Sequence, residues 1–355
     1  MIETKEALSA YLQPLIDQPE ALCAVDTEAD SLYRYAERLC LIQISDGQRH
    51  ELIDPLAIDD LSELATYLSG ATTWMHGADY DITMLRTALN VTPPTVYDTQ
   101  IAARLLGSRR FGYGNLVEDF LGVKLSKSSQ KADWGQRPLT PKMSEYALND
   151  VVYLFPLADI LVSQLKDKGR YDWFVESCEV AKAKVLERQP NTTEAWRING
   201  SGRLQARGLS YLRALWTWRD REAAEWDKPS FMVLTNKDLI AWSELLAEGK
   251  RPKFPERFRA QRRQRLTKAL RKADDEPKAD WPQKIRGKRR RLDEDFDRKV
   301  AALQKVRDAA ARDLDIDPSL IVTRAAMESL CLPDEYEPAD PQAVLMSWQR
   351  ALLNL

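Results

Sequence analysis

The alternation of apolar and polar residues divides the first half of the chain into short elements. Apolar runs at residues 21–28 and 39–45 predict buried strands, and the Asp-Gly-Gln sequence after the second run predicts a hairpin turn. Residues 59–70 begin with two acidic residues and end at a glycine, which predicts a helix. Residues 72–77 predict another strand. Helical spacing of apolar residues predicts three further helices, at residues 79–90, 98–107 and 141–165. Strands interleaved with helices predict an α/β domain that reaches about Arg188.

The second half of the chain is polar and helical in pattern, and it contains an internal repeat. Residues 218–234 resemble residues 306–322, since both join Arg-Asp to an alanine-rich stretch, Pro-Ser and an apolar run. The offset is 88 residues between the Arg-Asp pairs and 89 between the prolines. Two copies of a small helical domain are therefore predicted. The expected parts are a first domain at 1–188, a linker at 189–206, and helical domains at 207–285 and 286–355.

Composition limits the class of protein. The chain has 355 residues, of which 44% are hydrophobic and 30% charged, as in globular proteins with two or three domains. No apolar run reaches the length of a membrane span, and the N-terminus lacks a signal pattern, so we expect a cytoplasmic protein without membrane contact. Four dispersed cysteines without a CxxC pair argue against a zinc knuckle or a disulfide framework.

The net charge of −2 hides a strongly basic segment. Residues 250–291 contain 18 Lys or Arg and 5 Asp or Glu, a net charge of +13, so the other residues sum to −15. Such a segment is a candidate surface for a polyanion. A solvated helix face or a connector without a ligand explains the same charge equally well.

Several acidic residues lie within or next to the predicted apolar elements. Asp26 and Glu28 stand two positions apart on one strand, so both point to the same face and repel each other unless a cation lies between them. Asp81 opens the helix that follows the next strand. Tyr146 and Asp150 are four residues apart on an apolar helix, hence on one face, where an unpartnered carboxylate is costly to bury.

Four carboxylates and one phenol meet the needs of a two-metal phosphodiester hydrolase. Two divalent ions stabilise the attacking and leaving oxygens of an in-line displacement. Mg²⁺ prefers hard oxygen ligands and keeps several waters, so a few Asp and Glu residues suffice. The Tyr146 phenol can orient the attacking water without adding a charge.

Three short motifs, "VDTEAD", "HGADYD" and "YALND", occur in this order. With the segments "LCLIQIS" and "YDTQIAARLL" they resemble the DEDD exonucleases of the tyrosine subclass, and within them the ribonuclease D family. The repeated helical segments resemble the HRDC domain, of which that family typically carries two. The second copy lacks tryptophans at the positions of Trp216 and Trp218, so the resemblance is looser there.

This resemblance implies an α/β ribonuclease-H-like exonuclease domain, with a mixed sheet flanked by helices, followed by two small all-α HRDC-like domains. It implies a metal-dependent 3′-to-5′ exoribonuclease that trims single-stranded RNA 3′ ends, such as those of tRNA precursors, and releases nucleoside 5′-monophosphates. Carried over by motif, Tyr146 orients water. The ligands of two divalent ions, Mg²⁺ or Mn²⁺, are then Asp26, Glu28, Asp81 and Asp150.

A polar loop near residues 124–139 is expected to contact substrate. Cation, amide and aromatic groups are mixed there, as in single-strand binders, at Lys127, Gln130, Trp134 and Arg137. An ordinary polar loop is the alternative. His76 precedes the Asp81 helix; it could contact substrate, but a hydrogen bond that anchors the strand end explains it better than catalysis does.

Two other functions share these residues. A DNA exonuclease of the repair type uses the same five catalytic groups, and the motifs do not reveal the sugar, because the 2′-OH is sensed by local geometry. A catalytically silent RNA-binding protein is a third hypothesis, against which the intact acidic set argues.

Overall fold

The computed structural model describes residues 1–16, 18, 21–189, 193–285 and 293–355. They form two compact units. The first unit comprises Met1–Ala29, Leu39–Arg188 and Arg290–Leu355, and the second comprises Asp30–Arg38 and Gln189–Arg289.

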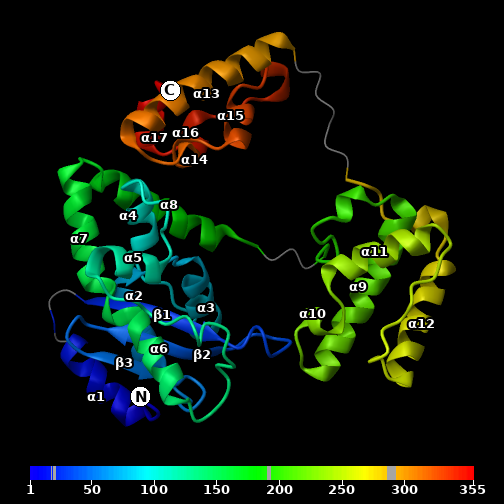
Figure 1. The fold of residues 1–355 in the computed structure, drawn as a ribbon, viewed down its shortest axis with the longest axis horizontal. Coiled ribbons are helices and arrows are strands. Elements are labelled where there is room, and N and C mark those ends of the chain that lie inside the picture. Colours follow the sequence, from blue (N-terminus) through cyan, green and yellow to red (C-terminus); the bar gives the residue numbers. More distant parts are fainter. Residues whose placement is uncertain (17, 19–20, 190–192, 286–292) are drawn as a thin grey trace. The chain divides into compact units, whose positions relative to one another are not determined.

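The first unit contains a five-stranded mixed sheet with the order β3-β2-β1-β4-β5. Its strands are β1 (Leu22–Ala29), β2 (Leu39–Ser45), β3 (His50–Ile53), β4 (Thr72–Met75) and β5 (Thr95–Asp98). Figure 1 labels strands β1, β2 and β3 of this sheet. Strands β1, β2 and β3 pair antiparallel, whereas β1, β4 and β5 pair parallel. The predicted mixed sheet and the predicted hairpin between β2 and β3 are both confirmed, with Gly47 in the turn at a φ of 90°.

Helices cover both faces of this sheet. Cys23 and Val25 point to one face, where they join a core with apolar residues of α1 (Lys5–Ile16), α2 (Ser62–Gly70) and α3 (Asp79–Leu89). Ala24 points to the other face, whose core is completed by α4 (Thr99–Leu105), α5 (Tyr113–Leu121), α6 (Pro141–Val152), α7 (Leu154–Asp167) and α8 (Tyr171–Glu187). The alternation along β1 therefore assigns Asp26 and Glu28 to the face that carries α6.

The helix predicted over residues 141–165 is broken at Tyr153, between α6 and α7. Pro156 has no N–H to donate to the carbonyl of residue 152, so the helical ladder cannot continue through this turn. Taken together, Pro141–Asp167 is the one stretch in the described chain that is long and apolar enough for a membrane span. Core helices have the same property, and Leu154, Leu157 and Leu161 are fully buried in the core.

The internal repeat is confirmed at the level of the backbone. Helices α9 (Ala206–Trp226) and α13 (Glu294–Leu314) each have 21 residues and end at an aspartate in the left-handed conformation. Each is followed by a one-turn helix, α10 (Ser230–Val233) or α14 (Pro318–Ile321), and then by α11 (Asn236–Ala247) or α15 (Arg324–Leu330). The first residues of the paired helices are offset by 88 residues in all three pairs. The prolines are offset by 89 residues because Pro229 is the N-cap of α10, whereas Pro318 is the first residue of α14.

The two copies also share an internal hydrogen bond. Arg219 donates to the carbonyl of Leu234 at 3.1 Å, and Arg307 donates to that of Val322 at 3.4 Å. Both arginines come from the long helix of their copy. The carbonyls that accept their hydrogen bonds belong to the extended residues that end the one-turn helices α10 and α14. The arginine of the Arg-Asp pair found in the sequence therefore makes the same backbone hydrogen bond in both copies.

The last helices of the chain pack within the first unit. Trp348 of α17 (Ser347–Leu353) stacks on Trp173 of α8, with ring centroids 4.9 Å apart. The Arg170 guanidinium donates to the carbonyls of Leu105 and Leu314, at 2.6 and 2.8 Å. These helices complete the core cluster around α7 and α8. The domain limits expected from the sequence stay predictions.

Candidate active site

Three carboxylates meet on one face of the sheet. One ligand oxygen each of Asp26, Glu28 and Asp150 can be chosen so that all lie within 4.8 Å of one another. Asp26 and Glu28 come from β1, and Asp150 comes from α6, which packs on that face. Helix α6 begins at Pro141, which suits the first helical position. The preceding Thr140 caps the helix, because its hydroxyl accepts a hydrogen bond from the Met143 N–H.

Asp81 approaches β1 from the side. Strand β4 pairs with β1 only up to Ala24, so the edge of β1 beyond that residue is left for the first turn of α3. There the Thr27 hydroxyl donates to the Asp81 carboxylate at 2.6 Å. Asp81 is 5% exposed, and its charge contributes to the raised pKa of both Asp26 and Glu28. The four predicted carboxylates thus form one cluster.

Asp98 organises the loop that brings Asp81 into place. Its carboxylate accepts hydrogen bonds from the N–H groups of Gly77, Ala78 and Gln100, at 2.9, 3.0 and 2.8 Å. Gly77 has a φ of +71°, which a side chain would strain, and this turn connects β4 to α3. One carboxylate therefore caps α4 and fixes the approach to α3 as well.

Burial and mutual repulsion disfavour the charged state of this cluster. Burial, strengthened by the charges of Asp150 and Asp81, raises the pKa of Glu28 to about 9. Burial raises the pKa of Asp150 to about 7, and the pKa of Asp81 to about 6 in spite of the Thr27 hydrogen bond. Burial and three neighbouring carboxylates raise the pKa of Asp26 well above its usual range. A bound cation would remove this cost, and hard oxygen ligands in such a group suit a divalent ion.

Tyr146 lies beside the carboxylates on α6. Burial first, and then the charges of Asp150, Glu28 and Asp26, raise the pKa of its phenol. The hydroxyl therefore stays protonated and can donate a hydrogen bond. Tyr113 of α5 supports the same helix, since its hydroxyl donates to the Asn149 carbonyl at 3.1 Å, one residue before Asp150.

The substrate role predicted for Trp134 and Arg137 is wrong. Trp134 is 1% exposed and packs against Tyr146, with ring centroids 6.0 Å apart. Its indole ring therefore has no exposed face on which a nucleotide base could stack. Arg137 donates all five of its N–H groups inside the protein: two to Asp54 and three to the carbonyls of Cys40, Trp134 and Gln136. No donor remains for a phosphate.

The other predicted contacts have different outcomes. Lys127 and Gln130 are exposed, so a substrate role for them stays a prediction. His76 Nδ1 lies 2.9 Å from the Thr99 hydroxyl, and its Nε2 atom is shielded from solvent. Burial lowers the pKa of His76. This arrangement fits the anchoring role, because a shielded neutral imidazole does not present a hydrogen-bonding atom to a substrate.

Three residues that position the site escaped the sequence analysis. Thr27 points to the face of β1 opposite to Asp26 and Glu28, so strand alternation alone separated it from them. Asp98 stands directly before a helix, where an N-cap role is common, and that signal was available. Tyr113 acts through a backbone carbonyl, which no side-chain pattern reveals.

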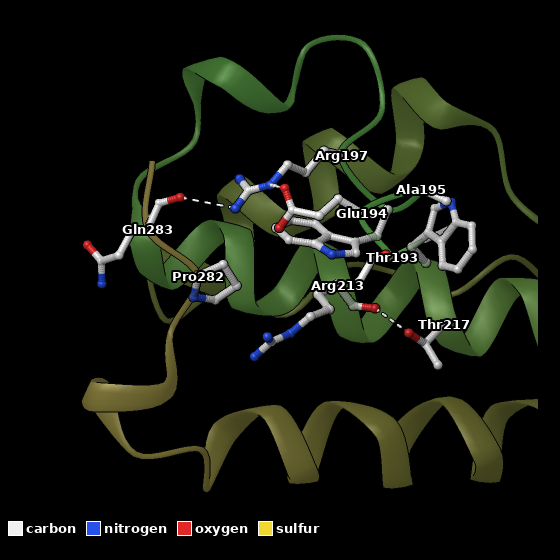
Figure 2. A pocket seen from close by; sticks show the side chains of 10 residues that line it. Thr193, Glu194, Ala195, Arg197, Arg213, Thr217, Pro282 and Gln283 are labelled. Atoms are coloured by element: carbon white, nitrogen blue, oxygen red, sulfur yellow. Dashed lines mark hydrogen bonds and ion pairs between the residues drawn. The ribbon is translucent and has the colours of Figure 1, made fainter. Parts of the chain in front are cut away.

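A separate pocket of about 550 Å³ lies in the second unit (Figure 2). Trp196, Trp216 and two arginines line it. Arg197 pairs with Glu194 at 2.5 Å, and Arg213 pairs with Glu276 at 2.6 Å. The charged side chains that line this pocket are thus engaged in ion pairs.

The basic segment is partly neutralised by ion pairs. Glu222, which is 2% exposed, accepts from Arg262 and Arg265, and Arg251 pairs with Asp274 at 2.6 Å. Helix α12 (Ala260–Asp274) has three exposed cations that form neither an ion pair nor a hydrogen bond in the described chain, namely Lys268, Arg271 and Lys272. The basic run at 286–292 lies outside the described residues.

The chain is similar to known exonucleases in sequence. Residues 1–166 match a family model described as 3′-5′ exonuclease. Ribonuclease D of Cronobacter turicensis is 33% identical over 246 residues, which cover 67% of this chain and 65% of that protein. The sequence match therefore spans slightly less than two thirds of that relative.

Similarity of fold extends further. The crystal structure of Escherichia coli RNase D, described as an exoribonuclease involved in structured RNA processing, matches with a TM-score of 0.73 and 25% identity over 100% of this chain and 96% of that chain. A protein from Bifidobacterium adolescentis matches with a TM-score of 0.81 and 24% identity over 99% of this chain and 94% of its own, which shows the shared fold.

Proposed function

We propose that the chain is a member of the 3′-5′ exonuclease family to which the matching ribonuclease D proteins belong, and that it is a metal-dependent 3′-to-5′ exoribonuclease. The observation that carries the proposal is the group of Asp26, Glu28 and Asp150 oxygens within 4.8 Å, with Asp81 next to them. These carboxylates have no basic partner among the described residues. Bound metal cations would balance their negative charge, which no structural ion pair does.

The four carboxylates would hold two divalent ions, Mg²⁺ or Mn²⁺. When bound, such ions activate water and stabilise the charge that develops on the attacking and leaving oxygens. Asp26 and Glu28 provide rigid ligands because they extend from a central strand, and α6 adds Asp150. Tyr146 donates a hydrogen bond from its protonated phenol and thereby orients the attacking water. The products are nucleoside 5′-monophosphates, released one at a time from a 3′ end.

The substrate we propose is RNA with a single-stranded 3′ end, including tRNA precursors. The active-site face must accept any nucleotide in turn, so a second contact is needed to hold a structured RNA. The exposed cations Lys268, Arg271 and Lys272 supply one, since they lie three and four residues apart on α12 and can follow a phosphate backbone. We also assign the two repeated helical regions to the HRDC type, because their helices match and because an arginine makes the same backbone hydrogen bond in both.

One assay tests this function. The protein is incubated with matched 5′-labelled RNA and DNA oligonucleotides in Mg²⁺, Mn²⁺ or EDTA, and the products are resolved by length. We expect RNA to shorten stepwise from the 3′ end with either ion and to stay intact in EDTA. Preferential shortening of DNA would assign the repair-type alternative, and binding of RNA without cleavage in any metal would identify a silent RNA-binding protein.

A further inference from the structure

Gln43 is a buried polar residue that the proposed mechanism does not use. It lies in the middle of β2, is 0% exposed, and neither its Oε1 nor its Nε2 has a hydrogen-bond partner in the described chain. A glutamine amide offers two donors and two acceptor sites, and buried amides are almost always hydrogen-bonded. A leucine or methionine would fill the same space without this cost, so the amide needs an explanation.

The strand register shows what the amide faces. Gln43 stands directly opposite Asp26 in the antiparallel β1–β2 ladder. Side chains of opposed residues point to the same face, with Cβ atoms about 4.5–5.5 Å apart. Gln43 therefore lies on the face that carries the carboxylate cluster. On its other side it opposes Leu52 of β3, which has no polar side chain to offer.

The neighbours of Gln43 along β2 on this face offer it no hydrogen-bond partner. Ser45 is the next residue of β2 on the same face, but its hydroxyl lies 2.8 Å from His50 Nδ1 and accepts from the Gly47 N–H at 3.0 Å. Leu41, the preceding residue on this face, stands opposite Glu28 and is apolar. Of the two residues directly opposite Gln43 in the ladder, Asp26 and Leu52, Asp26 is the one with free acceptor oxygens.

We propose that Gln43 is a positioning residue for the metal site. Its Nε2 group donates a hydrogen bond to the Asp26 carboxylate in the metal-loaded enzyme and fixes the orientation in which Asp26 presents its oxygens to the ions. A neutral amide suits this position, because it stabilises an ionised carboxylate without competing with the cations for it. Outer partners of metal ligands act in this way in other metalloenzymes. The inference rests on the proposed function, since it requires that Asp26 binds a cation.

The Gln43→Met variant tests the inference, because methionine keeps the length of the side chain and removes its hydrogen-bonding groups. Thermal unfolding in EDTA should show unchanged or higher stability, since a buried unpartnered amide is lost. Calorimetric titration with Mn²⁺ should show affinity lower by roughly tenfold or more, the usual effect of removing an outer partner of a metal ligand. At saturating metal, kcat should fall while KM for an RNA oligonucleotide stays unchanged.

Leu41→Met is the matched control. It changes the same face of the same strand, opposite Glu28, and should leave Mn²⁺ affinity and kcat at the wild-type values. Gln43→Leu is a second variant in case methionine disturbs folding. If Gln43→Met is less stable in EDTA but binds Mn²⁺ as tightly as the wild type, Gln43 is structural and the inference fails, while the proposed function stands. If the wild type itself binds no Mn²⁺, the proposed function fails and the inference fails with it.

Discussion

The hydroxyl of Thr27 donates a hydrogen bond to the carboxylate of Asp81, with the two oxygens 2.6 Å apart. Thr27 lies between Asp26 and Glu28 on β1 but points to the opposite face of the sheet. One strand therefore contributes to the site from both faces: it provides two carboxylates on one side and fixes a third from the other. This hydrogen bond lowers the pKa of Asp81, against the effect of burial.

Replacing Thr27 with Val should weaken metal binding. The substitution keeps the shape of the side chain and removes the donor, so the pKa of Asp81 rises above its present value of about 6 and its carboxylate loses its orientation. We expect Mn²⁺ affinity to fall by about tenfold in calorimetry, as for other partners of metal ligands. The acidic limb of the pH–rate profile should move to higher pH. Thr73→Val is the control, since Thr73 is also buried and its hydroxyl lies 3.8 Å from the Cys23 thiol, not beside a carboxylate of the site. Equal losses in both variants would contradict the specific role of Thr27.

The extent to which the sequence predicted this site depends on the kind of interaction. Asp26, Glu28, Tyr146 and Asp150 were predictable because strand alternation and helical spacing fix which side chains share a face. The contact from Thr27 to Asp81 was not, because it depends on where β4 ends relative to β1, and pairing between distant strands has no local signature.

The same distinction explains the errors at Trp134 and Arg137. Their residue types suit contact with nucleic acid, but burial decides the role, and burial of a loop is set by tertiary packing. Asp54, which accepts two hydrogen bonds from Arg137, lies 83 residues earlier in the chain. The break between α6 and α7 was within reach of the sequence, since Pro156 marks it.

The metal-free protein should become less stable as the pH rises. The folded-state pKa values of Asp81, Asp150 and Glu28 are about 6, 7 and 9, all above those of an unfolded chain, near 4. At these three groups the native state then binds more protons than the unfolded state between pH about 4 and about 9. They therefore make the free energy of unfolding fall with increasing pH across this window. Urea unfolding in EDTA at pH 5, 7 and 8.5 measures the slope.

Removing one carboxylate provides the control for this slope. Asp150→Asn should flatten it and should raise stability in EDTA at pH 8.5, because both burial of a charge and repulsion are relieved. Saturating Mg²⁺ should also flatten the slope in the wild type. An identical slope in wild type and variant would show that other groups determine the pH dependence.

Losses of the metal ligands should not add. Asp26 and Asp150 are proposed to hold the same pair of ions, so Asp26→Asn alone should abolish turnover nearly as completely as the double variant with Asp150→Asn, as expected for groups that act as a unit. Single-turnover assays with an RNA oligonucleotide provide the measurement. Asp119→Asn controls for loss of an acidic residue, since Asp119 is exposed and pairs with Arg110 at 3.3 Å. Near-normal turnover of Asp26→Asn at saturating Mg²⁺ would exclude the shared site.

Tyr146→Phe should separate chemistry from metal binding. The phenyl ring still packs on Trp134, whereas the hydroxyl that orients water is lost. We expect kcat to fall by about 10²-fold or more, the usual contribution of a positioned catalytic group, with unchanged Mn²⁺ affinity. Tyr67→Phe is the control, since it also removes a partly buried hydroxyl, which bonds the Leu22 carbonyl. A variant that loses metal affinity but keeps its rate at saturation would refute the role of Tyr146.

Trp348→Ala should destabilise the exonuclease domain, although Trp348 lies near the end of the chain. Its ring is 5% exposed and stacks on Trp173 of α8, and α8 contributes Phe174 to the core beside Trp74 of β4. Truncating a buried tryptophan leaves a cavity and costs about 3 kcal/mol or more. We therefore expect the free energy of unfolding to fall by about that amount, with β-sheet and helix signals lost in one transition. Trp226→Ala is the control, because Trp226 is 46% exposed, and it should change stability little. If instead Trp348→Ala unfolds the last helices alone while the sheet melts at the wild-type urea concentration, these helices are an independent domain and not part of the exonuclease core.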